Sequence, residues 1–288
     1  MNNRVGILGG TSPVGVQVVN MLTNKGCDVV ALSRSKHTAD GRVEWISIQD
    51  LPSAASPTLS DIDLWISVSP IWVLGDYLDL IKQSGTKKIV VLSSTSRFTK
   101  TTSTDAHEAK VVNDLIAGEE ALQAWAGQHG IQWVLLRPTL IYGRSTDRNL
   151  SEIVRMIRKF RFFPLLGSGK GLRQPIYVDD VAQACLQAAL SNRAVNKAYN
   201  ISGTEILTYR EMVARVFRAM GLAPRLVQIN TSLFKIAIAA LRMLPRYRNW
   251  SFDMVDRMSK DMVFPHDEAK MDFGFSPRGF ELADRDIQ

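Results

Sequence analysis

The sequence predicts an α/β protein, with a Rossmann-type, doubly wound parallel sheet and a smaller, mostly helical C-terminal domain. An apolar, strand-like run at residues 5–8 reaches a glycine-rich turn and continues into a helix-like stretch at 16–22. Further strand-like runs alternate with helical segments, and this alternation requires right-handed crossovers and a parallel sheet. The second half is richer in helix and aromatic residues, which predicts the smaller domain.

Strands of the sheet are expected where short apolar or alternating runs are bounded by turn residues. Along the first half these runs are residues 5–8, 28–33, 43–48, 64–68, 88–92 and 133–136. A long helix is expected from about Asp105 to Gln128, either interrupted at Gly118 or continuous through it.

In the second half, two strand-like pieces at 175–178 and 198–201 flank a helix at 179–190. The expected division is a dinucleotide-binding domain at 1–145 and a substrate domain at 146–288, with about 175–203 returning to the first domain.

Composition narrows the function classes. A chain of 288 residues can bury a large core. Cys27 and Cys185 lack the spacing of metal ligands, so we expect packing residues, a reducing compartment, a cytoplasmic location and no metal site. The net charge of +7 could indicate nucleic-acid binding, but the basic residues are spread along the chain. An anionic cofactor and an anionic substrate explain the charge at least as well, so we expect no nucleic-acid partner.

Residues 232–244 are strongly apolar but too short to span a bilayer, and Lys235 and Arg242 lie among them. They form either an amphipathic helix packed on the second domain or a surface helix that touches a membrane. We expect the packed helix and no contact with a membrane surface.

The turn after the first strand has the composition of a dinucleotide-binding loop. Gly9 and Gly10 allow a tight turn and a close ligand approach, and Gly15 allows the helix to pack closely. The helix N-terminus then offers free N–H groups and a partial positive charge to a pyrophosphate. Ser12 departs from this pattern, because a third glycine is usual there.

The residues after the second strand predict which dinucleotide is bound. An acidic residue there would bind the ribose 2′-hydroxyl, but this chain has Ser33 and Arg34. Arg34 could pair with a 2′-phosphate, to which Ser33 could donate; alternatively, Arg34 and Lys36 are solvated loop charges. We expect NADP, with NAD as the alternative. Asp50 is placed to accept from the adenine amino group, with Leu51 against the ring.

Four motifs occur in order: Gly9–Gly15, Val91–Thr95, Leu136–Gly143 and Pro175–Ala182. With them the chain resembles, over nearly its whole length, the extended short-chain dehydrogenase/reductase family, in its NAD-dependent epimerase/dehydratase group. The C-terminal half is similar to nucleotide-sugar enzymes. The residues expected to bind the cofactor are Gly9, Gly10, Thr11, Ser12, Pro13, Val14, Gly15, Ser33, Arg34, Asp50, Leu51, Val68, Ser69 and Pro138.

The resemblance implies a catalytic Ser or Thr at the end of the fifth strand, which orients the substrate hydroxyl or keto group. Thr95 occupies that position, with Ser94 and Ser93 just before it. The alternative is simple turn formation by this Ser/Thr run. The predicted catalytic residues are therefore Thr95 and Ser94.

The resemblance also implies a Tyr-x-x-x-Lys pair on the following helix, and this sequence lacks it. One alignment register places Val111 and Leu115 at the two positions, and a shifted register places Ala106 and Lys110 there. Titratable residues at the start of this helix either replace the pair or form a solvated face: His107, Glu108 and Lys110.

Substrate contacts are implied for Asn149, which alternatively caps a helix, and for Arg173, which would pair with a phosphate. Tyr142 on the preceding loop is a further substrate-binding candidate, and Asp179 and Asp180 are expected to cap the helix that follows them. A basic stretch adds positive field near an anionic substrate or serves solubility: Arg155, Arg158, Lys159 and Arg161.

Together these features predict an NAD(P)-dependent epimerase, dehydratase or reductase that acts on a nucleoside-diphosphate-sugar-like small molecule by hydride transfer. The alternative is an NAD(P)-binding protein with little or no catalysis, acting as a redox sensor or an assembly subunit. A homodimer is the expected assembly.

Overall fold

The structure is a computed structural model that describes residues 3–35, 37–38, 41–49, 51, 59–99, 106–144, 148–230 and 259–287. The side chains of residues 106, 107, 148, 149 and 166 lie outside the description as well. Three predictions therefore lie outside the described residues: those for Lys36, for Asp50 and for the apolar stretch 232–244.

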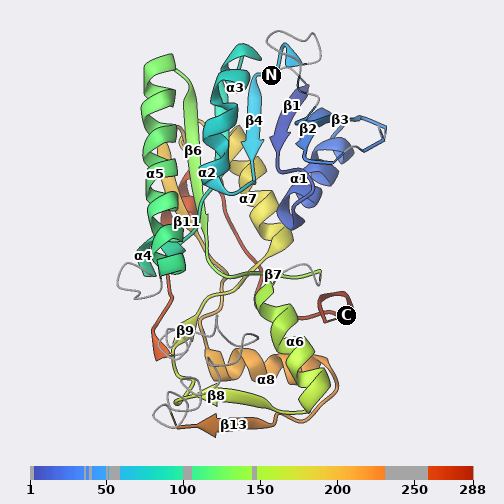
Figure 1. Cartoon of the computed structure of the whole chain (residues 1–288), viewed down its shortest axis with the longest axis vertical. Helices are drawn as coiled ribbons and strands as arrows, with labels where there is room; N and C mark the ends of the chain where they lie inside the picture. The colour runs from blue at the N-terminus through green and yellow to red at the C-terminus, as the bar shows by residue number, and fades with distance from the viewer. Residues whose placement is uncertain are drawn as a thin grey trace.

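A seven-stranded, all-parallel sheet forms the upper part of the molecule (Figure 1). Its strands are β1 (Arg4–Leu8), β2 (Asp28–Ser33), β3 (Val43–Ser47), β4 (Leu64–Ser67), β5 (Lys88–Leu92), β6 (Gln132–Pro138) and β11 (Lys197–Ile201). Their order is β11-β6-β5-β4-β1-β2-β3, so the winding reverses between β1 and β4. The predicted Rossmann-type, doubly wound parallel sheet is confirmed.

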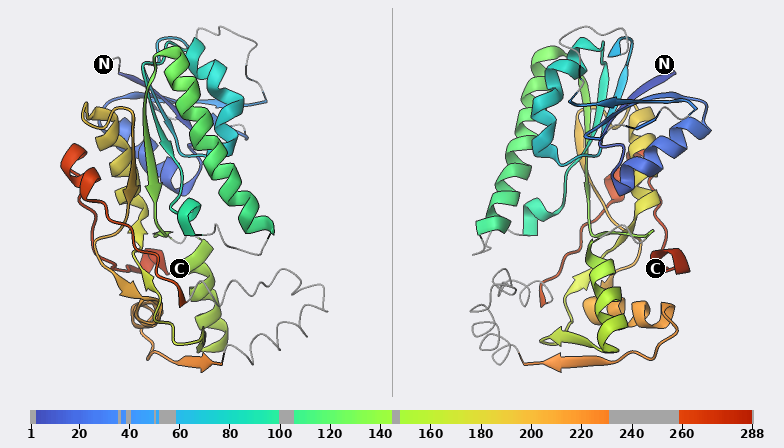
Figure 2. Two further views of the ribbon diagram at one scale, coloured as in Figure 1. Left: turned by 90° about the vertical axis from the view of Figure 1, so that its left-hand side faces the viewer. Right: turned by 45° about the vertical axis from the view of Figure 1, so that its right-hand side comes forward.

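Helices cover both faces of the sheet, as Figure 2 shows. One face carries α1 (Pro13–Asn24) and α7 (Val178–Leu190). The other carries α2 (Ile71–Leu74), η2 (Gly75–Tyr77), α3 (Leu78–Gln83) and α5 (Ala106–His129). Helix α5 is continuous through Gly118. The glycine lies where the helix packs closely against Ile71, and a Cβ there would lie 3.0 Å from the Ile71 side chain. Each face has its own hydrophobic cluster, which gives a three-layer body.

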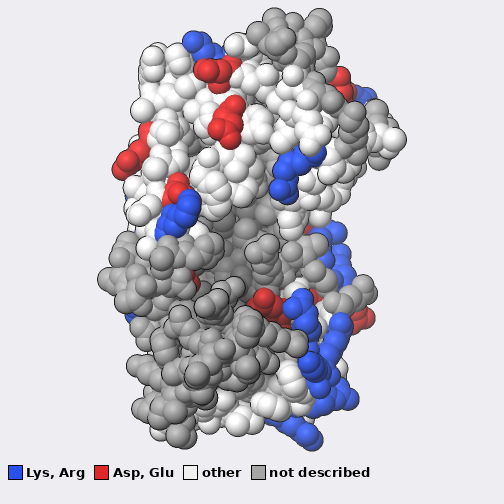
Figure 3. All heavy atoms as spheres, in the orientation of Figure 1, with Lys and Arg blue, Asp and Glu red and all other residues white. Residues whose placement is uncertain are grey.

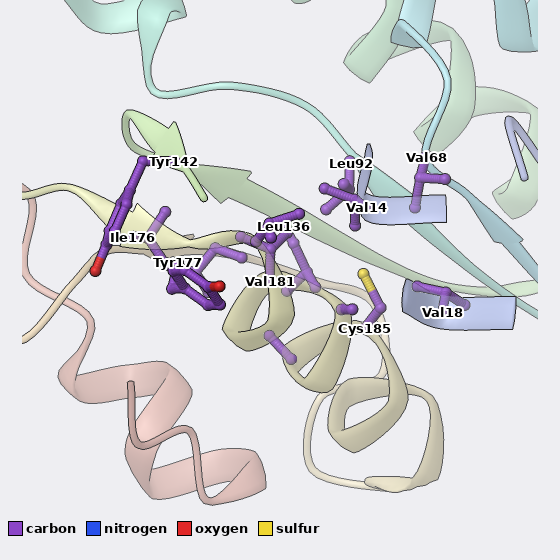
Figure 4. Packing of buried hydrophobic residues seen from close by; sticks show 14 of the residues in the cluster. Val14, Val18, Val68, Leu92, Leu136, Tyr142, Ile176, Tyr177, Val181 and Cys185 are labelled. Carbon is purple, nitrogen blue, oxygen red and sulfur yellow. The ribbon is translucent and has the colours of Figure 1, made fainter. Parts of the chain in front are cut away.

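The cysteines are packing residues, as expected. Cys185 on α7 is fully buried against α1, near Val18, and burial raises the pKa of its thiol to about 12 (Figure 4). Cys27 is half-buried and packs against the same cluster.

The second half combines helices with three two-stranded sheets, which the sequence did not predict. They pair β7 (Ile141–Tyr142) with β10 (Ile176–Tyr177), β8 (Phe163–Leu166) with β13 (Leu226–Ile229), and β9 (Leu172–Arg173) with β12 (Leu207–Thr208). The remaining elements are α4 (Ser96–Thr99), α6 (Arg148–Phe160), α8 (Tyr209–Ala219), α11 (Asp267–Phe273) and η4 (Asp284–Asp286). Strand β11 adds to the edge of the main sheet beside β6, whereas β10 lies outside that sheet. The domain boundaries stay a prediction.

Within the described ranges, every helix is too short or too polar to cross a lipid bilayer.

Candidate functional site

The glycine loop lies at the point where the winding of the sheet reverses, which is where open α/β sheets bind ligands. Gly9 has a φ of +89°, and a Cβ on it would lie 2.7 Å from the backbone nitrogen of Ser69, just beyond β4. A Cβ on Gly15 would lie only 2.2 Å from the Gly9 carbonyl oxygen. The loop is therefore a tight turn that only glycine fits at both positions, as expected of a cradle for the pyrophosphate of a dinucleotide.

Ser12 departs from the glycine pattern because it caps α1. Its Oγ accepts a hydrogen bond from the Gly15 N–H at 3.0 Å, and Pro13 follows at the start of the helix. The Val16 N–H donates to the Ser12 carbonyl at 2.9 Å. Among the described residues, Val14 is the only residue of the first turn whose backbone N–H has no partner. The helix start therefore offers one free N–H group, whereas several were expected.

In the loop after β2, Ser33 is hydrogen-bonded within the protein and Arg34 is exposed. The buried Ser33 hydroxyl accepts from the Ser35 N–H at 3.2 Å and lies 3.0 Å from His37 Nε2. Arg34 is exposed and has no hydrogen bond with the described residues, so it remains available to a 2′-phosphate. The His37 ring lies 4.7 Å from the ring of Trp45 on β3, a contact that the sequence did not predict.

The other predicted cofactor residues line the same edge of the sheet. Val68 is buried beneath Gly9, and the Ser69 hydroxyl lies 3.2 Å from that of Ser67. Thr11 is exposed at the tip of the loop, and Leu51 is half-buried against the core.

A hollow of about 360 Å³ lies beside α1 and reaches the glycine loop at Gly10 only. Val16, Asn20 and Thr23 of α1 line one side, and Trp45 lines the other. It runs along the flank of α1 and does not include the residues at the reversal point beyond β4.

The predicted catalytic hydroxyls at the end of β5 are engaged within the protein. Thr95 is buried, and its Oγ1 and its N–H both donate to the Pro138 carbonyl, each at 3.1 Å. The Ser94 Oγ accepts from the Ser96 N–H at 3.1 Å. The structure thus brings Thr95 and Pro138 together and uses the Thr95 proton in that contact.

A buried carboxylate beside these hydroxyls was not predicted. Glu119 of α5 is fully buried and accepts from the Ser93 hydroxyl at 2.5 Å. Arg137 of β6 donates to it through Nε at 3.0 Å and Nη2 at 2.6 Å, and Arg97 is a further partner. Burial lowers the pKa of both guanidinium groups. We call Ser93, Arg97, Glu119 and Arg137 the Glu119 cluster; it ties β5, α4, α5 and β6 together.

Helix α5 contains no tyrosine. At the first counted register, Leu115 is buried and Val111 packs against the same hydrophobic cluster. At the shifted register, Lys110 is exposed and pairs with Asp114 at 2.6 Å, whereas the Ala106 side chain lies outside the description, as does that of His107. Glu108, the remaining titratable candidate, is buried.

The predicted substrate residues are held by contacts of their own. Tyr142 is buried, its hydroxyl donates to the Gly279 carbonyl at 3.2 Å, and burial raises its pKa. Its ring packs edge-on against that of Tyr177, as Figure 4 shows. Arg173 is buried and donates through Nη1 to the carbonyls of Leu172 and Lys260, at 2.7 and 2.8 Å. Asn149 lies one residue inside α6, with its side chain outside the description. Their substrate roles stay predictions.

The expectation that Asp179 and Asp180 cap α7 is wrong. The N-cap is Tyr177, which makes no side-chain capping bond. Asp179 pairs with Arg144 at 2.8 Å, and Asp180 pairs with Arg278 at 2.8 Å. The carboxylates therefore hold the loop after β7 and the C-terminal segment against the start of α7.

Comparison with known proteins bears on the family. Residues 76–202 match a model of the NAD dependent epimerase/dehydratase family. The resemblance predicted from the sequence motifs is confirmed. The epimerase/dehydratase match begins after the glycine loop and extends from η2 to the end of β11.

Solved structures of this type share the fold over nearly the whole chain. UDP-glucuronic acid 4-epimerase from Bacillus cereus, in complex with NAD, has a TM-score of 0.73 at 14% identity and covers 98% of this chain and 95% of its own. UDP-glucose 4-epimerase from Thermotoga maritima, with UDP-glucose, has a TM-score of 0.67 at 14% identity and covers 95% and 93%. The NAD-dependent family and the NAD-bound neighbour support the expected NAD(P) cofactor.

Curated relatives match over shorter segments. Subunit 9 of the NADH dehydrogenase [ubiquinone] 1 alpha subcomplex from Arabidopsis thaliana is 27% identical over 146 residues, which are 47% of this chain and 36% of that protein. A 2-alkyl-3-oxoalkanoate reductase from Stenotrophomonas maltophilia is 30% identical over 165 residues, 53% of this chain and 49% of that protein. The chain thus matches less than half the length of either relative.

Proposed function

We propose that this protein binds NAD(P)H in the crevice between β1 and β4 and has lost the tyrosine-assisted hydride transfer of the epimerase/dehydratase family. The observation that carries the proposal is a contrast along the carboxyl edge of the sheet. Gly9 and Gly15 allow a tight turn in which the Val14 N–H has no partner among the described residues, while the hydroxyls at the end of β5 bond to the protein itself.

The residues of this chain would hold the cofactor in three ways. Gly9, Gly10 and Gly15 would let the backbone approach the pyrophosphate, and the Val14 N–H at the start of α1 would donate to it. Arg34 would pair with a 2′-phosphate, since its guanidinium has no competing partner among the described residues. The bound dinucleotide would supply a hydride donor or acceptor.

Proton transfer is the missing half of the chemistry. A general acid or base must lie within hydrogen-bond reach of the reacting group and titrate near the working pH. Tyr142 meets neither condition well, because its hydroxyl bonds to Gly279 and burial raises its pKa further above neutrality. Thr95 donates to Pro138, and α5 has no tyrosine. A role as a cofactor-dependent sensor or assembly subunit follows, and the similarity to a protein named as an NADH dehydrogenase subunit supports it.

The second candidate is hydride transfer to or from a nucleotide-sugar-like substrate. It is supported by a fold shared over nearly the full length with proteins solved in complex with UDP sugars, and by similarity to a reductase. In this case Tyr142, Asn149 and Arg173 would contact the substrate, and Thr95 would orient its hydroxyl or keto group.

Cofactor titration followed by a turnover assay separates the candidates. Trp45 lies under Gly10, where a Cβ would be 3.2 Å from the indole, so NADPH should change the tryptophan fluorescence and raise Tm. W45F should lose part of the fluorescence change and keep the shift in Tm. Binding of the dinucleotide with no formation of reduced nicotinamide from NADP+ or NAD+ in the presence of UDP-glucose or UDP-glucuronic acid supports the first candidate. Formation of reduced nicotinamide, as a sugar hydroxyl is oxidised to a ketone, supports the second, and the absence of any NADPH or NADH effect overturns both.

A further inference from the structure

Positive charge is concentrated in two stretches of the second half, which corrects the expectation that basic residues are spread along the chain. Residues 153–178 and 212–252 together contain thirteen Lys and Arg and no Asp or Glu. The rest of the chain carries 22 basic and 28 acidic residues, so it is net negative although the whole chain is at +7. The excess positive charge of the sequence therefore lies in these two stretches.

The described part of this charge gathers over α6 and the turn into β8, at the lower right of Figure 3. Leu150, Ile153 and Ile157 point into the core, while the opposite face of α6 is exposed. We define the α6–β8 patch by its exposed residues: Arg155, Arg158, Lys159, Phe160, Arg161 and Phe162. Across the described ranges, none of its cations forms an ion pair with a carboxylate.

Two aromatic rings are exposed within this basic surface. Phe160 is 50% exposed and Phe162 is 38% exposed, with their ring centroids 6.1 Å apart. The Lys159 ammonium lies 5.1 Å from the Phe160 ring. Large apolar side chains left open to water in one place mark an interaction surface.

The local backbone presents these side chains outward. Arg161 has a φ of +60°, the left-handed conformation in which glycine is usual at the end of a helix. The turn leads into Phe163, whose N–H donates to the Arg225 carbonyl at 2.9 Å, so the exposed Arg225 adjoins the patch. Val227 on the edge strand β13 is also 49% exposed.

We propose that the α6–β8 patch docks this protein on an anionic lipid surface. Cations attract the negative headgroups, and phenyl rings beside them can insert at the boundary between headgroups and acyl chains. The patch lies at the end of the molecule away from the main sheet, so docking leaves the glycine loop open to cofactor (Figure 1). This inference differs from the packed or membrane-touching helix considered for 232–244 and does not depend on cofactor binding.

Two alternative roles for the positive charge fit the patch less well. The cations alone would be enough to attract an anionic substrate. That role does not explain why the two phenylalanines are exposed. Nucleic-acid binding would use the same cations with aromatic stacking. Its affinity would come chiefly from the phosphates, so removing both rings would change it less than removing two charges.

Vesicle co-sedimentation tests the proposal with the full chain. We expect binding to phosphatidylcholine vesicles that contain phosphatidylglycerol, no binding to phosphatidylcholine alone, and weakening as salt is raised. K159Q/R161Q should lower the partition coefficient roughly 25-fold, because each cation near an anionic surface contributes roughly fivefold. F160S/F162S should also lower it, while the slope with salt stays unchanged.

The matched control is K25Q/K82Q, which removes the same charge from exposed positions outside the patch and should change binding less than twofold. Thermal melting verifies that each variant folds. If K159Q/R161Q does not fold, the same measurement is made with R155Q/R225Q. Three results would each overturn the proposal: an equal loss in K25Q/K82Q, no binding to either vesicle, or binding to a single-stranded oligonucleotide without binding to anionic vesicles.

Discussion

The two sides of the carboxyl edge of the sheet are built in opposite ways. Around β1 and β4, Gly9 and Gly15 allow a close-packed turn, and the Val14 N–H has no partner among the described residues. Around β5 and β6, every hydroxyl of Ser93–Thr95 has a partner, and Glu119 gathers two arginines in the interior. In the proposed function, the first side binds the cofactor and the second side is structural.

This difference indicates which function is retained when a family's acid/base pair is absent. Buried ionic clusters are weak evidence for stability, since desolvation offsets much of their attraction. The Glu119 cluster is better understood as fixing the geometry of the loop after β5. This structural role agrees with the proposed function, in which the side around β5 and β6 is structural and the side around β1 and β4 binds the cofactor.

The largest expected effect is from E119Q, which leaves Arg97 and Arg137 without their shared carboxylate. Breaking a buried ion pair lowers the free energy of unfolding by about 3–5 kcal/mol. Because both arginines are partly exposed, we expect a loss of about 3 kcal/mol. Urea denaturation measures it, with the exposed neighbour E120Q as a control expected within about 0.5 kcal/mol. A loss of NADPH affinity at unchanged stability would contradict the division between the two sides.

G15A tests the first side with a smaller change. The added methyl group would overlap the Gly9 carbonyl, so we expect about 1–3 kcal/mol of destabilisation and an NADPH Kd weakened roughly tenfold or more. G127A is the matched control in α5, where a Cβ meets nothing within 4 Å, and it should stabilise by about 0.5–1 kcal/mol. Equal NADPH affinity in both variants would show that the cofactor does not use the cradle.

R34D tests which dinucleotide binds at the same side of the sheet edge. A charge-assisted hydrogen bond to a 2′-phosphate is worth about 1.5–3 kcal/mol, so the NADPH-to-NADH affinity ratio should fall roughly tenfold or more. Calorimetric titration of both cofactors measures the ratio, with K25D as the control for the change in net charge. Unchanged affinities would remove the argument for NADP.

The smallest effect is expected at His266. It lies two residues after Phe264, whose ring contacts that of Phe98 beside the Glu119 cluster. Burial lowers the pKa of His266, whose Nδ1 lies 2.8 Å from the Ser202 hydroxyl, although Asp267 partly opposes the shift. The unfolded chain then binds a proton more readily, so stability falls as pH drops below about 6.5. H266N should lose this part of the pH dependence. Identical profiles for the two proteins, from melting curves between neutral and mildly acidic pH, would contradict it.

Periodicity predicted the sheet well because each strand carries its own signal. In the runs at 5–8, 28–33 and 88–92, residues 5–8, 29–32 and 89–92 are buried on both faces and contain no polar side chain, and the glycine loop follows the first run. The order of motifs also predicted the family, and local chemistry alone predicted the accessible Arg34.

Contacts between distant residues could not be predicted in this way. Ser93, Glu119 and Arg137 meet only because β5, α5 and β6 pack together, and nothing within any of these segments indicates that meeting. The contact between His37 and Trp45 is another example. Asp180 lies at the start of a helix, which indicated a cap, but it accepts hydrogen bonds from Arg278, nearly a hundred residues away along the chain. A sequence pattern reports which face is buried but not which partner covers it.

The most direct test of the central claim is a single-turnover measurement. Excess protein is loaded with NADP+ or NAD+ and mixed with UDP-glucose or UDP-glucuronic acid, and the absorbance of the reduced nicotinamide is followed. The account predicts that the dinucleotide stays bound and that no reduced nicotinamide forms, while G15A binds the dinucleotide roughly tenfold more weakly. Stoichiometric reduction of the bound dinucleotide, with oxidation of a sugar hydroxyl to a ketone, would contradict the account and establish that the side built from Thr95 and the Glu119 cluster still performs chemistry.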